Sequence, residues 1–217
     1  MFDTLQVKGM VIQATPVGDF DKRIVILTKE RGKITAFARG ARRPNSPFLA
    51  GTRPFSFGTF TVMEGRDYYR VRQVDIENFF EEMSEDLEVA YYGFYFLEWA
   101  DYYGREFVDG KDTLNLLYQT FRALLKPALP NSLVRCIFEL KMLTINGEYP
   151  NPDGEDRHPS TVYALDYVIR APIEKLYNFV VTPEVETEMR KILDQHIEKV
   201  IDRKFKSLEM YFSIAKI

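Results

Sequence analysis

The sequence has few of the residues that build disulfides, metal centres and nucleotide sites. Its 217 residues include one cysteine, Cys136, and two histidines, His158 and His196. These are too few for an internal disulfide or for a structural zinc, which takes about four Cys or His ligands. There is no GxxxxGK[ST] loop, no GxGxxG fingerprint, no apolar run of the roughly 20 residues that span a membrane, and no secretory signal pattern. We therefore expect a cytoplasmic protein without cofactor, metal or enzymatic activity.

The net charge of −3 conceals a strong division along the chain. Residues 1–74 carry a net charge of +7, and residues 75–217 carry −10. This asymmetry indicates that the basic first part binds a polyanion and that the acidic second part has a different role. With 46% apolar residues, the chain also has enough hydrophobic material for a packed core.

The first 80 residues alternate between apolar and polar side chains, as small all-β units do. Turn-forming residues separate five runs that we expect to be strands, at residues 7–15, 20–28, 33–39, 55–63 and 68–76. Five short strands suit a small barrel, with the OB-fold as the first choice and an SH3-like barrel as its rival.

After residue 80 the apolar period becomes helical, so we expect an α+β protein. A five-stranded OB-fold domain would cover residues 1–80, and an all-helical domain would cover residues 81–217. The run 87–103 is apolar nearly all round, which is typical of a buried central helix. Cys136 lies in another apolar helical run and is expected in the core. Helix caps are expected at Ser84, Asp112, Ser132 and Thr182.

Two segments of the expected barrel combine arginines with aromatic rings. Residues 39–46, RGARRPNS, place three guanidinium groups around a glycine, where a phosphate can approach the backbone. By the strand period of two, Phe37 and Arg39 share one face of the third strand. Tyr68 and Arg70 share a face of the fifth in the same way. Cations that follow the backbone and rings that stack on bases are what binding of single strands requires. The candidate DNA-binding residues are Lys33, Arg39, Arg42, Arg43, Arg70 and Arg72.

Four motifs, in this order and at these separations, give the chain a resemblance to a known family. They are D-x-x-x-x-x-L-T-x-E-x-G-K at 21–33, the segment 39–46 with Arg39 where lysine is usual, FELKML at 138–143 followed by a G-x-Y-P turn, and KSL at 206–208. Over essentially its full length the chain resembles the DNA-repair protein RecO family.

The resemblance implies a non-enzymatic recombination mediator associated with the nucleoid. RecO-type proteins bind single- and double-stranded DNA, anneal complementary strands, pair with RecR and engage the single-stranded-DNA-binding protein SSB, which helps to load RecA onto SSB-coated single strands. Many members carry a four-cysteine zinc module after the G-Y-x-P turn. Residues 147–160 of this sequence contain no cysteine, so we expect the zinc module to be absent.

The acidic second part is expected to be a scaffold and a protein-docking surface. The resemblance implies that the C-terminal tail of SSB docks there, and that tail is acidic and ends in an aromatic residue. Such a ligand needs an apolar pocket for its ring and a cation for its carboxylates. The candidate cations are Arg135, just ahead of the 138–143 motif, and Lys206.

Two other classes of function remain open from the residues alone. One is an interaction adaptor whose barrel binds a protein partner and whose contact with DNA is incidental. The other is a metal-dependent hydrolase that would use the acidic loop with Asp153, Glu155 and Asp156. The second is disfavoured because the spacing of these carboxylates matches no known metal loop.

Overall fold

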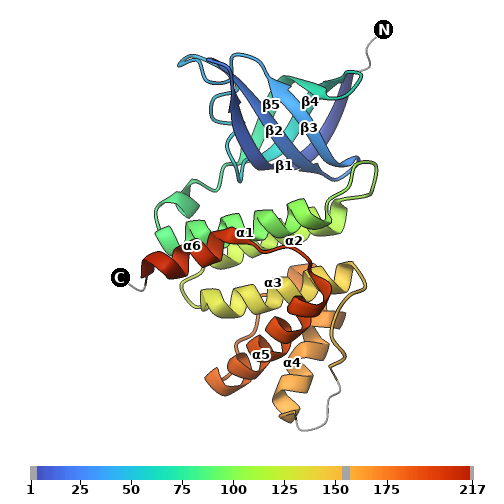
Figure 1. Ribbon diagram of the computed structural model, residues 1–217, viewed down its shortest axis with the longest axis vertical. Coiled ribbons are helices and arrows are strands. Elements are labelled where there is room, and N and C mark those ends of the chain that lie inside the picture. The colour runs from blue at the N-terminus through green and yellow to red at the C-terminus, as the bar shows by residue number, and fades with distance from the viewer. Residues whose placement is uncertain (1–3, 153–156, 216–217) are drawn as a thin grey trace. The chain divides into compact units, whose positions relative to one another are not determined.

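The structure is a computed structural model that describes residues 4–152 and 157–215 (Figure 1). The chain divides into two compact units. The first comprises Met1–Glu85 with Leu97–Leu114, and the second comprises Asp86–Phe96 with Asn115–Ile217. Within the described ranges, no helix is both long and apolar enough to cross a membrane.

The first unit contains a closed barrel of five strands (Figure 1). They are β1 (Thr4–Val17), β2 (Asp21–Thr28), β3 (Gly32–Ala38), β4 (Phe57–Glu64) and β5 (Tyr69–Asn78). Their order around the barrel is β1-β2-β3-β5-β4, and all neighbours are antiparallel except β3 and β5. Because β5 lies between β3 and β4, the chain makes the Greek-key crossing of an OB-fold. The predicted OB-fold is confirmed, and the ends of its five predicted strands differ from the observed ends by at most three residues.

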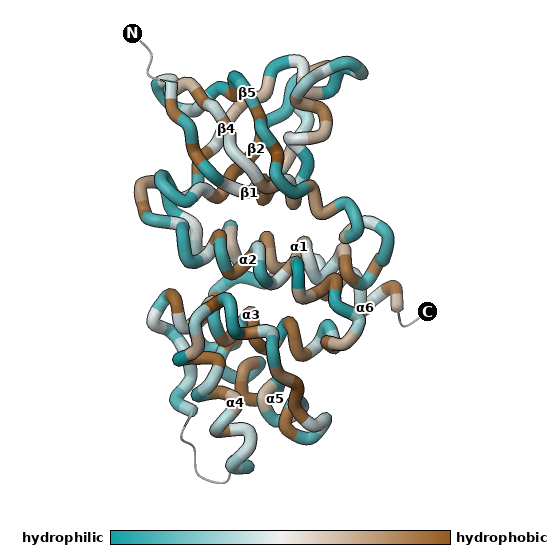
Figure 2. Tube along the Cα trace, turned by 180° about the vertical axis from the view of Figure 1, so that it is seen from behind, coloured by the Kyte–Doolittle hydropathy of each residue, from teal (hydrophilic) through white to brown (hydrophobic). Residues whose placement is uncertain are grey.

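Alternation along β3 places every second side chain in the barrel. Ile34, Ala36 and Ala38 of β3 are buried in the core, whereas Lys33, Thr35 and Phe37, which alternate with them, remain half-exposed on the outer face. Hydrophilic and hydrophobic segments accordingly follow one another along the barrel strands in Figure 2. The other strands add the apolar side chains Val7, Val11, Ile24, Ile26, Phe60, Val62, Tyr69 and Val71 to the same core.

The segment 104–110 runs along the β2–β3 turn of the barrel. Backbone hydrogen bonds join Lys33 N to Arg105 O at 3.0 Å, Phe107 N to Arg31 O at 2.9 Å and Gly110 N to Lys29 O at 3.2 Å. This close approach requires glycine at position 32. The residue has a φ of +63°, and a Cβ atom there would lie 2.0 Å from the carbonyl oxygen of Arg105.

Six α-helices are found in the described part of the chain: α1 (Leu87–Tyr103), α2 (Lys111–Leu124), α3 (Asn131–Ile145), α4 (Pro159–Arg170), α5 (Pro183–Val200) and α6 (Lys206–Ala215). The bounds predicted for α1 are confirmed, but its central, buried position is not. Leu87 and Phe94 of α1 are 58% and 41% exposed. The most continuously buried helix is α3, in which every residue from Cys136 to Leu143 is buried.

Three of the four predicted caps were wrong. Asp86 rather than Ser84 accepts a hydrogen bond at the start of α1, from Val89 N at 3.0 Å. Asp109 rather than Asp112 accepts the Lys111 N–H before α2. At α3, Ser132 lies inside the helix, which starts after Pro130 without a side-chain cap. Only Thr182 caps its helix as predicted, because Pro183 fixes the first helical position of α5.

Candidate nucleic-acid interface

A row of cations and one ring crosses the outer face of the barrel. Arg23 of β2 lies opposite Phe37 of β3, and Phe37 lies opposite Arg70 of β5. Phe37 is half-exposed and Arg23 is exposed. Adjacent strands lie about 5 Å apart, so Phe37 has one arginine neighbour on each side, Arg23 on β2 and Arg70 on β5.

Tyr68 and Arg72 extend this row along β5. The Tyr68 ring meets Phe37 edge-on with centroids 4.8 Å apart, and the Arg70 guanidinium lies 5.9 Å from the Tyr68 centroid. Arg72 is exposed one step further, and its Nη2 lies 3.1 Å from the sulfur of Met63. We call the set formed by Arg23, Phe37, Arg39, Tyr68, Arg70 and Arg72 the cationic face.

The loop after β3 carries the three arginines of the RGARRPNS segment, and they differ in their contacts. Arg39 and Arg43 are exposed, and the Arg43 guanidinium lies 5.0 Å from the centroid of the Phe20 ring. Arg42 donates from Nη1 to the carbonyl oxygens of Gly18 and Asp19 at 3.1 and 3.2 Å. Arg42 therefore holds a turn, and the phosphate contact predicted for this exposed residue stays a prediction.

Lys33, the remaining candidate, faces an acidic partner. Its ammonium lies 3.0 Å from the carboxylate of Asp101 and 2.6 Å from the Asp101 carbonyl oxygen. It lines a groove of about 470 Å³ that also exposes the carboxylates of Glu64, Asp67 and Glu106. Arg66 and Arg105 also line this groove, so its charges are mixed. Because Asp101 already compensates the ammonium of Lys33, the geometry gives Lys33 less support than the arginines.

Arg23 is the residue of the cationic face that the sequence analysis missed. Its neighbours in sequence, Lys22 and Asp21, form no motif with it, and its place beside Phe37 depends on the β2–β3 register. The available signal was the strand period, because Ile24 and Ile26 are core residues and Arg23 must then point outward.

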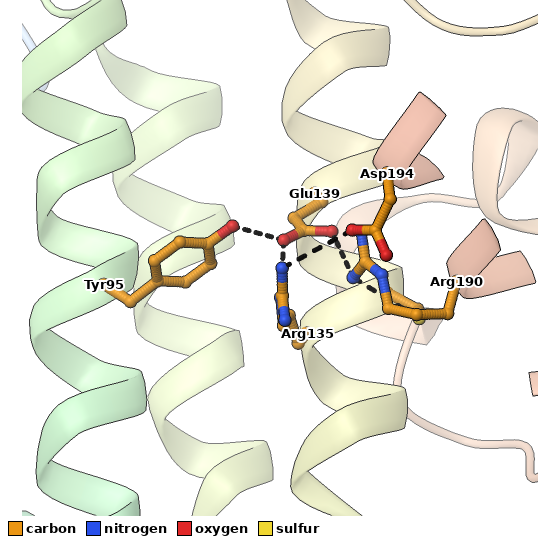
Figure 3. A network of polar contacts seen from close by, with 6 residues as sticks. Tyr95, Arg135, Glu139, Arg190 and Asp194 are labelled. Carbon is orange, nitrogen blue, oxygen red and sulfur yellow. Dashed lines mark hydrogen bonds and ion pairs between the residues drawn. The ribbon is translucent and has the colours of Figure 1, made fainter. Parts of the chain in front are cut away.

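In the second unit, a buried carboxylate is held by two arginines (Figure 3). Glu139 of α3 is fully buried; Arg135 Nε lies 2.7 Å from its Oε1, and Arg190 Nη1 of α5 lies 2.5 Å from its Oε2. The Tyr95 hydroxyl of α1 donates to the same carboxylate, and Asp194 lies 2.9 Å from Arg190 Nη2. We call these five residues the Glu139 network.

The network sets the ionisation of its members. Burial alone would raise the pKa of Glu139, but the charges of Arg190 and Arg135 outweigh burial and leave this pKa below its ordinary value. Burial also raises the pKa of the neighbouring Cys136 thiol to about 12. The cysteine is fully buried, as predicted, and has the character of an inert core residue.

The two residues predicted to dock the SSB tail occupy different surroundings. Arg135 is already engaged by Glu139 and stacks 5.2 Å from the centroid of Tyr95, so its charge is largely compensated. Lys206 is exposed at the first residue of α6. Between the end of α5 and α6 lies a groove of about 570 Å³, and its lining includes Arg135, Ile201, Lys204, Phe205 and Leu208.

A metal site receives no support from the described residues, which contain no cluster of three or more His, Cys, Asp or Glu side chains able to hold an ion. The acidic loop residues Asp153, Glu155 and Asp156 lie outside the described residues. His158 accepts a hydrogen bond from Ser160 N and caps α4. His196 is half-exposed and forms a hydrogen bond with the Glu148 carbonyl oxygen.

The fold defines a class of protein: an OB-fold barrel with a cationic, aromatic outer face, joined to a helical unit. Comparisons with known proteins narrow this class. Residues 1–80 match the family model "Recombination protein O N terminal", and residues 151–209 match "Recombination protein O C terminal". The chain belongs to the RecO family, whose general role is the mediation of DNA repair and recombination.

Curated relatives agree with this assignment over nearly the whole chain. The protein named DNA repair protein RecO of Alkaliphilus metalliredigens is 28% identical over 95% of this chain and 98% of its own length. Its namesake from Acetivibrio thermocellus is 25% identical over 98% of both chains. That of Clostridium perfringens strain 13 is 28% identical over 93% of this chain and 95% of its own.

Proposed function

We propose that this protein is a non-enzymatic mediator that binds single- and double-stranded DNA on the cationic face of its barrel. The observation that carries the proposal is the row Arg23–Phe37–Arg70, in which two arginines are the strand neighbours of an outward-facing phenylalanine. The cations neutralise phosphates and the ring stacks on a base. With RecR, the protein would anneal complementary strands and help to load RecA onto single strands coated with SSB, in the cytoplasm at the nucleoid.

Salt dependence tests this proposal. If Arg23, Arg39, Arg43, Arg70 and Arg72 each neutralise one phosphate of a single strand, log K should fall against log[salt] with a slope of about −3.5, at about −0.7 per contact. The triple variant Arg39→Ala/Arg70→Ala/Arg72→Ala should lower the slope to about −1.4 and weaken binding strongly at low salt. Fluorescence anisotropy of a labelled oligonucleotide between two salt concentrations measures both quantities.

The matched control is Arg170→Ala, which removes an exposed arginine of α4 that pairs with Asp166 in the second unit. It should bind DNA as the wild type does. If the DNA affinity does not depend on salt, or if the triple variant binds DNA as tightly as the wild type, the cationic face is not the DNA-binding site. Either result would favour the interaction adaptor whose barrel binds a protein partner.

For the SSB tail, we propose docking in the groove between α5 and α6. Ile201, Phe205 and Leu208 give it an apolar floor for an aromatic ring. Because Arg135 is compensated by Glu139, the other cations of the lining are Arg203 and Lys204, and Lys206 follows the groove residue Phe205 in the chain. The lining also contains Asp194, Glu198, Asp202 and Glu209, so these cations must outweigh nearby carboxylates to hold an acidic tail. An apolar groove between α4 and α5 fits such a tail less well, since it has no charged residue in its lining.

The double variant Lys204→Ala/Lys206→Ala should weaken binding of an acidic peptide with a C-terminal aromatic residue. We expect a loss on the order of tenfold, as charge-assisted contacts contribute roughly 1.5–3 kcal/mol when formed and less at an exposed rim. Fluorescence titration of the labelled peptide measures the loss, with Lys175→Ala as the control on another surface. Unchanged affinity of the double variant would place the docking site elsewhere.

A further inference from the structure

An exposed phenylalanine stands at the turn between β1 and β2, outside the cationic face. The Phe20 side chain is 49% exposed, and the Arg43 guanidinium lies over its ring at 5.0 Å from the centroid. The two side chains form a cation–π pair, and about half of the ring surface remains accessible to a ligand.

The turn that carries Phe20 is fixed by the loop that carries Arg43. Arg42 Nη1 donates to the Asp19 carbonyl oxygen, and Arg42 N donates to the Phe20 carbonyl oxygen at 2.8 Å. At the residue that follows Phe20, the side chain of Asp21 accepts a hydrogen bond from Gly40 N at 2.8 Å. The backbone on both sides of Phe20 is therefore tied to residues 40–42.

The side chain of Arg43 passes close to Gly40. Gly40 has a φ of +67°, and a Cβ atom at this position would lie 3.6 Å from Cδ of Arg43 and 3.8 Å from its Nε. The arginine stem thus runs past the bare face of a glycine before its guanidinium reaches the ring. Ring and cation are arranged before any ligand arrives, which reduces the entropy lost on binding.

We propose that Phe20 and Arg43 form a stacking site for one unpaired base of single-stranded DNA, with Arg42 as its positioning residue. This inference rests on the proposed function and extends it. The base stacks on the ring–guanidinium pair, and the free N–H donors of Arg43 reach a neighbouring phosphate. A duplex presents no open base face along its length, so this site favours single strands, whereas arginines that contact phosphates alone serve both forms.

The variant Phe20→Trp provides a direct reporter. Trp99 is the only tryptophan of the chain and is fully buried, so a second tryptophan at position 20 would be the exposed one. A stacked base quenches indole fluorescence. We expect Phe20→Trp to bind a single-stranded oligonucleotide as tightly as the wild type and to be quenched on binding, whereas an equal concentration of duplex leaves its emission nearly unchanged.

The variant Phe20→Ala measures the contribution of the ring. We expect single-strand affinity to fall roughly 5- to 100-fold, in the range found for loss of one stacking partner, with duplex affinity nearly unchanged. Tyr163→Ala, which removes a 74% exposed ring from α4, is the matched control and should leave both affinities unchanged. Arg42→Ala should resemble Phe20→Ala, and Arg42→Lys should restore part of the loss, because a lysine can still donate to the turn carbonyls.

The outcomes separate this site from the cationic face. Wild-type single-strand affinity in Phe20→Ala, together with an unquenched Phe20→Trp, overturns the stacking site and leaves the proposed function standing, provided that the Arg39/Arg70/Arg72 variant still loses affinity. Equal losses for single strands and duplex also overturn it, since a stacking site must discriminate. A wild-type protein that binds no DNA overturns the proposed function and this inference together.

Discussion

Replacing Glu139 with glutamine is expected to lower the free energy of unfolding by about 3–5 kcal/mol, the usual cost of removing one partner from a buried ion pair. Glutamine keeps the shape of the side chain but removes the buried charge. Arg135 and Arg190, each with only 20% of its side chain exposed, then keep the carboxylate of Asp194, which is 51% exposed and compensates them less well. Equilibrium denaturation followed by circular dichroism at a helix band measures the change. Arg190→Ala should have an effect of similar size.

The control for this prediction is an ion pair of the same kind on the surface. Arg170 and Asp166 lie 2.6 Å apart in α4 with side chains 79% and 39% exposed. Arg170→Ala should change the free energy of unfolding by less than about 1 kcal/mol. If Glu139→Gln were as mild as Arg170→Ala, the Glu139 network would be a packing feature and its charges would be irrelevant to stability.

The same carboxylate predicts a dependence on pH. Because the folded-state pKa of Glu139 is below its unfolded value of about 4.3, its contribution to stability is complete above that value. The contribution is lost as the pH falls through the lowered folded pKa. The stability difference between wild type and Glu139→Gln should therefore shrink below about pH 4.

Substituting Gly32 with alanine is expected to cost roughly 2–5 kcal/mol. The left-handed backbone contributes about 1–2 kcal/mol for a residue with a Cβ atom, and overpacking a filled position adds about 1–3 kcal/mol. The added atom would lie 2.0 Å from the Arg105 carbonyl oxygen and 2.4 Å from that of Val108. Both neighbours are backbone, so the segment 104–110 must move away from the barrel. Denaturant unfolding measures the loss.

Gly18 separates the two causes. Its φ of +54° is also left-handed, but no atom lies within 4 Å of the position where a Cβ would be built. Gly18→Ala should therefore show the conformational cost alone, about 1–2 kcal/mol. If Gly18→Ala and Gly32→Ala lowered the free energy of unfolding equally, the segment 104–110 would move away from an added Cβ atom without a measurable cost.

Local patterns in the sequence were sufficient for the barrel and for the bounds of α1. Alternation located the five strands because each buries one side of a single barrel. The helix caps failed where several Ser and Asp residues compete within a few positions, as at Ser84 and Asp86, and succeeded at Thr182, where a proline removes the ambiguity.

The candidate site depends on pairings that no local pattern encodes. Arg23 joins Phe37 through strand register, and Lys33 meets Asp101 from 68 positions away. The Glu139 network joins three helices. Arg135 lies one turn before Glu139 in α3, but Arg190 and Tyr95 come from distant parts of the chain, so no local pattern predicts them as partners. One signal was present: Glu139 interrupts the apolar helix α3, and a buried carboxylate there requires cations from elsewhere in the chain.

The barrel closes along a short seam. Strands β3 and β5 are joined by the two residue pairs Ala36↔Tyr69 and Phe37↔Arg70, and one of these pairs belongs to the cationic face. The β1–β2–β3 meander supplies Arg23 and Phe37, whereas the β4–β5 hairpin supplies Arg70 and Arg72. A strand of DNA bound across the seam, as proposed, would contact both the β1–β2–β3 meander and the β4–β5 hairpin. Any ligand that binds only the closed barrel adds its binding free energy to closure, so DNA bound in this way would stabilise the β3–β5 seam.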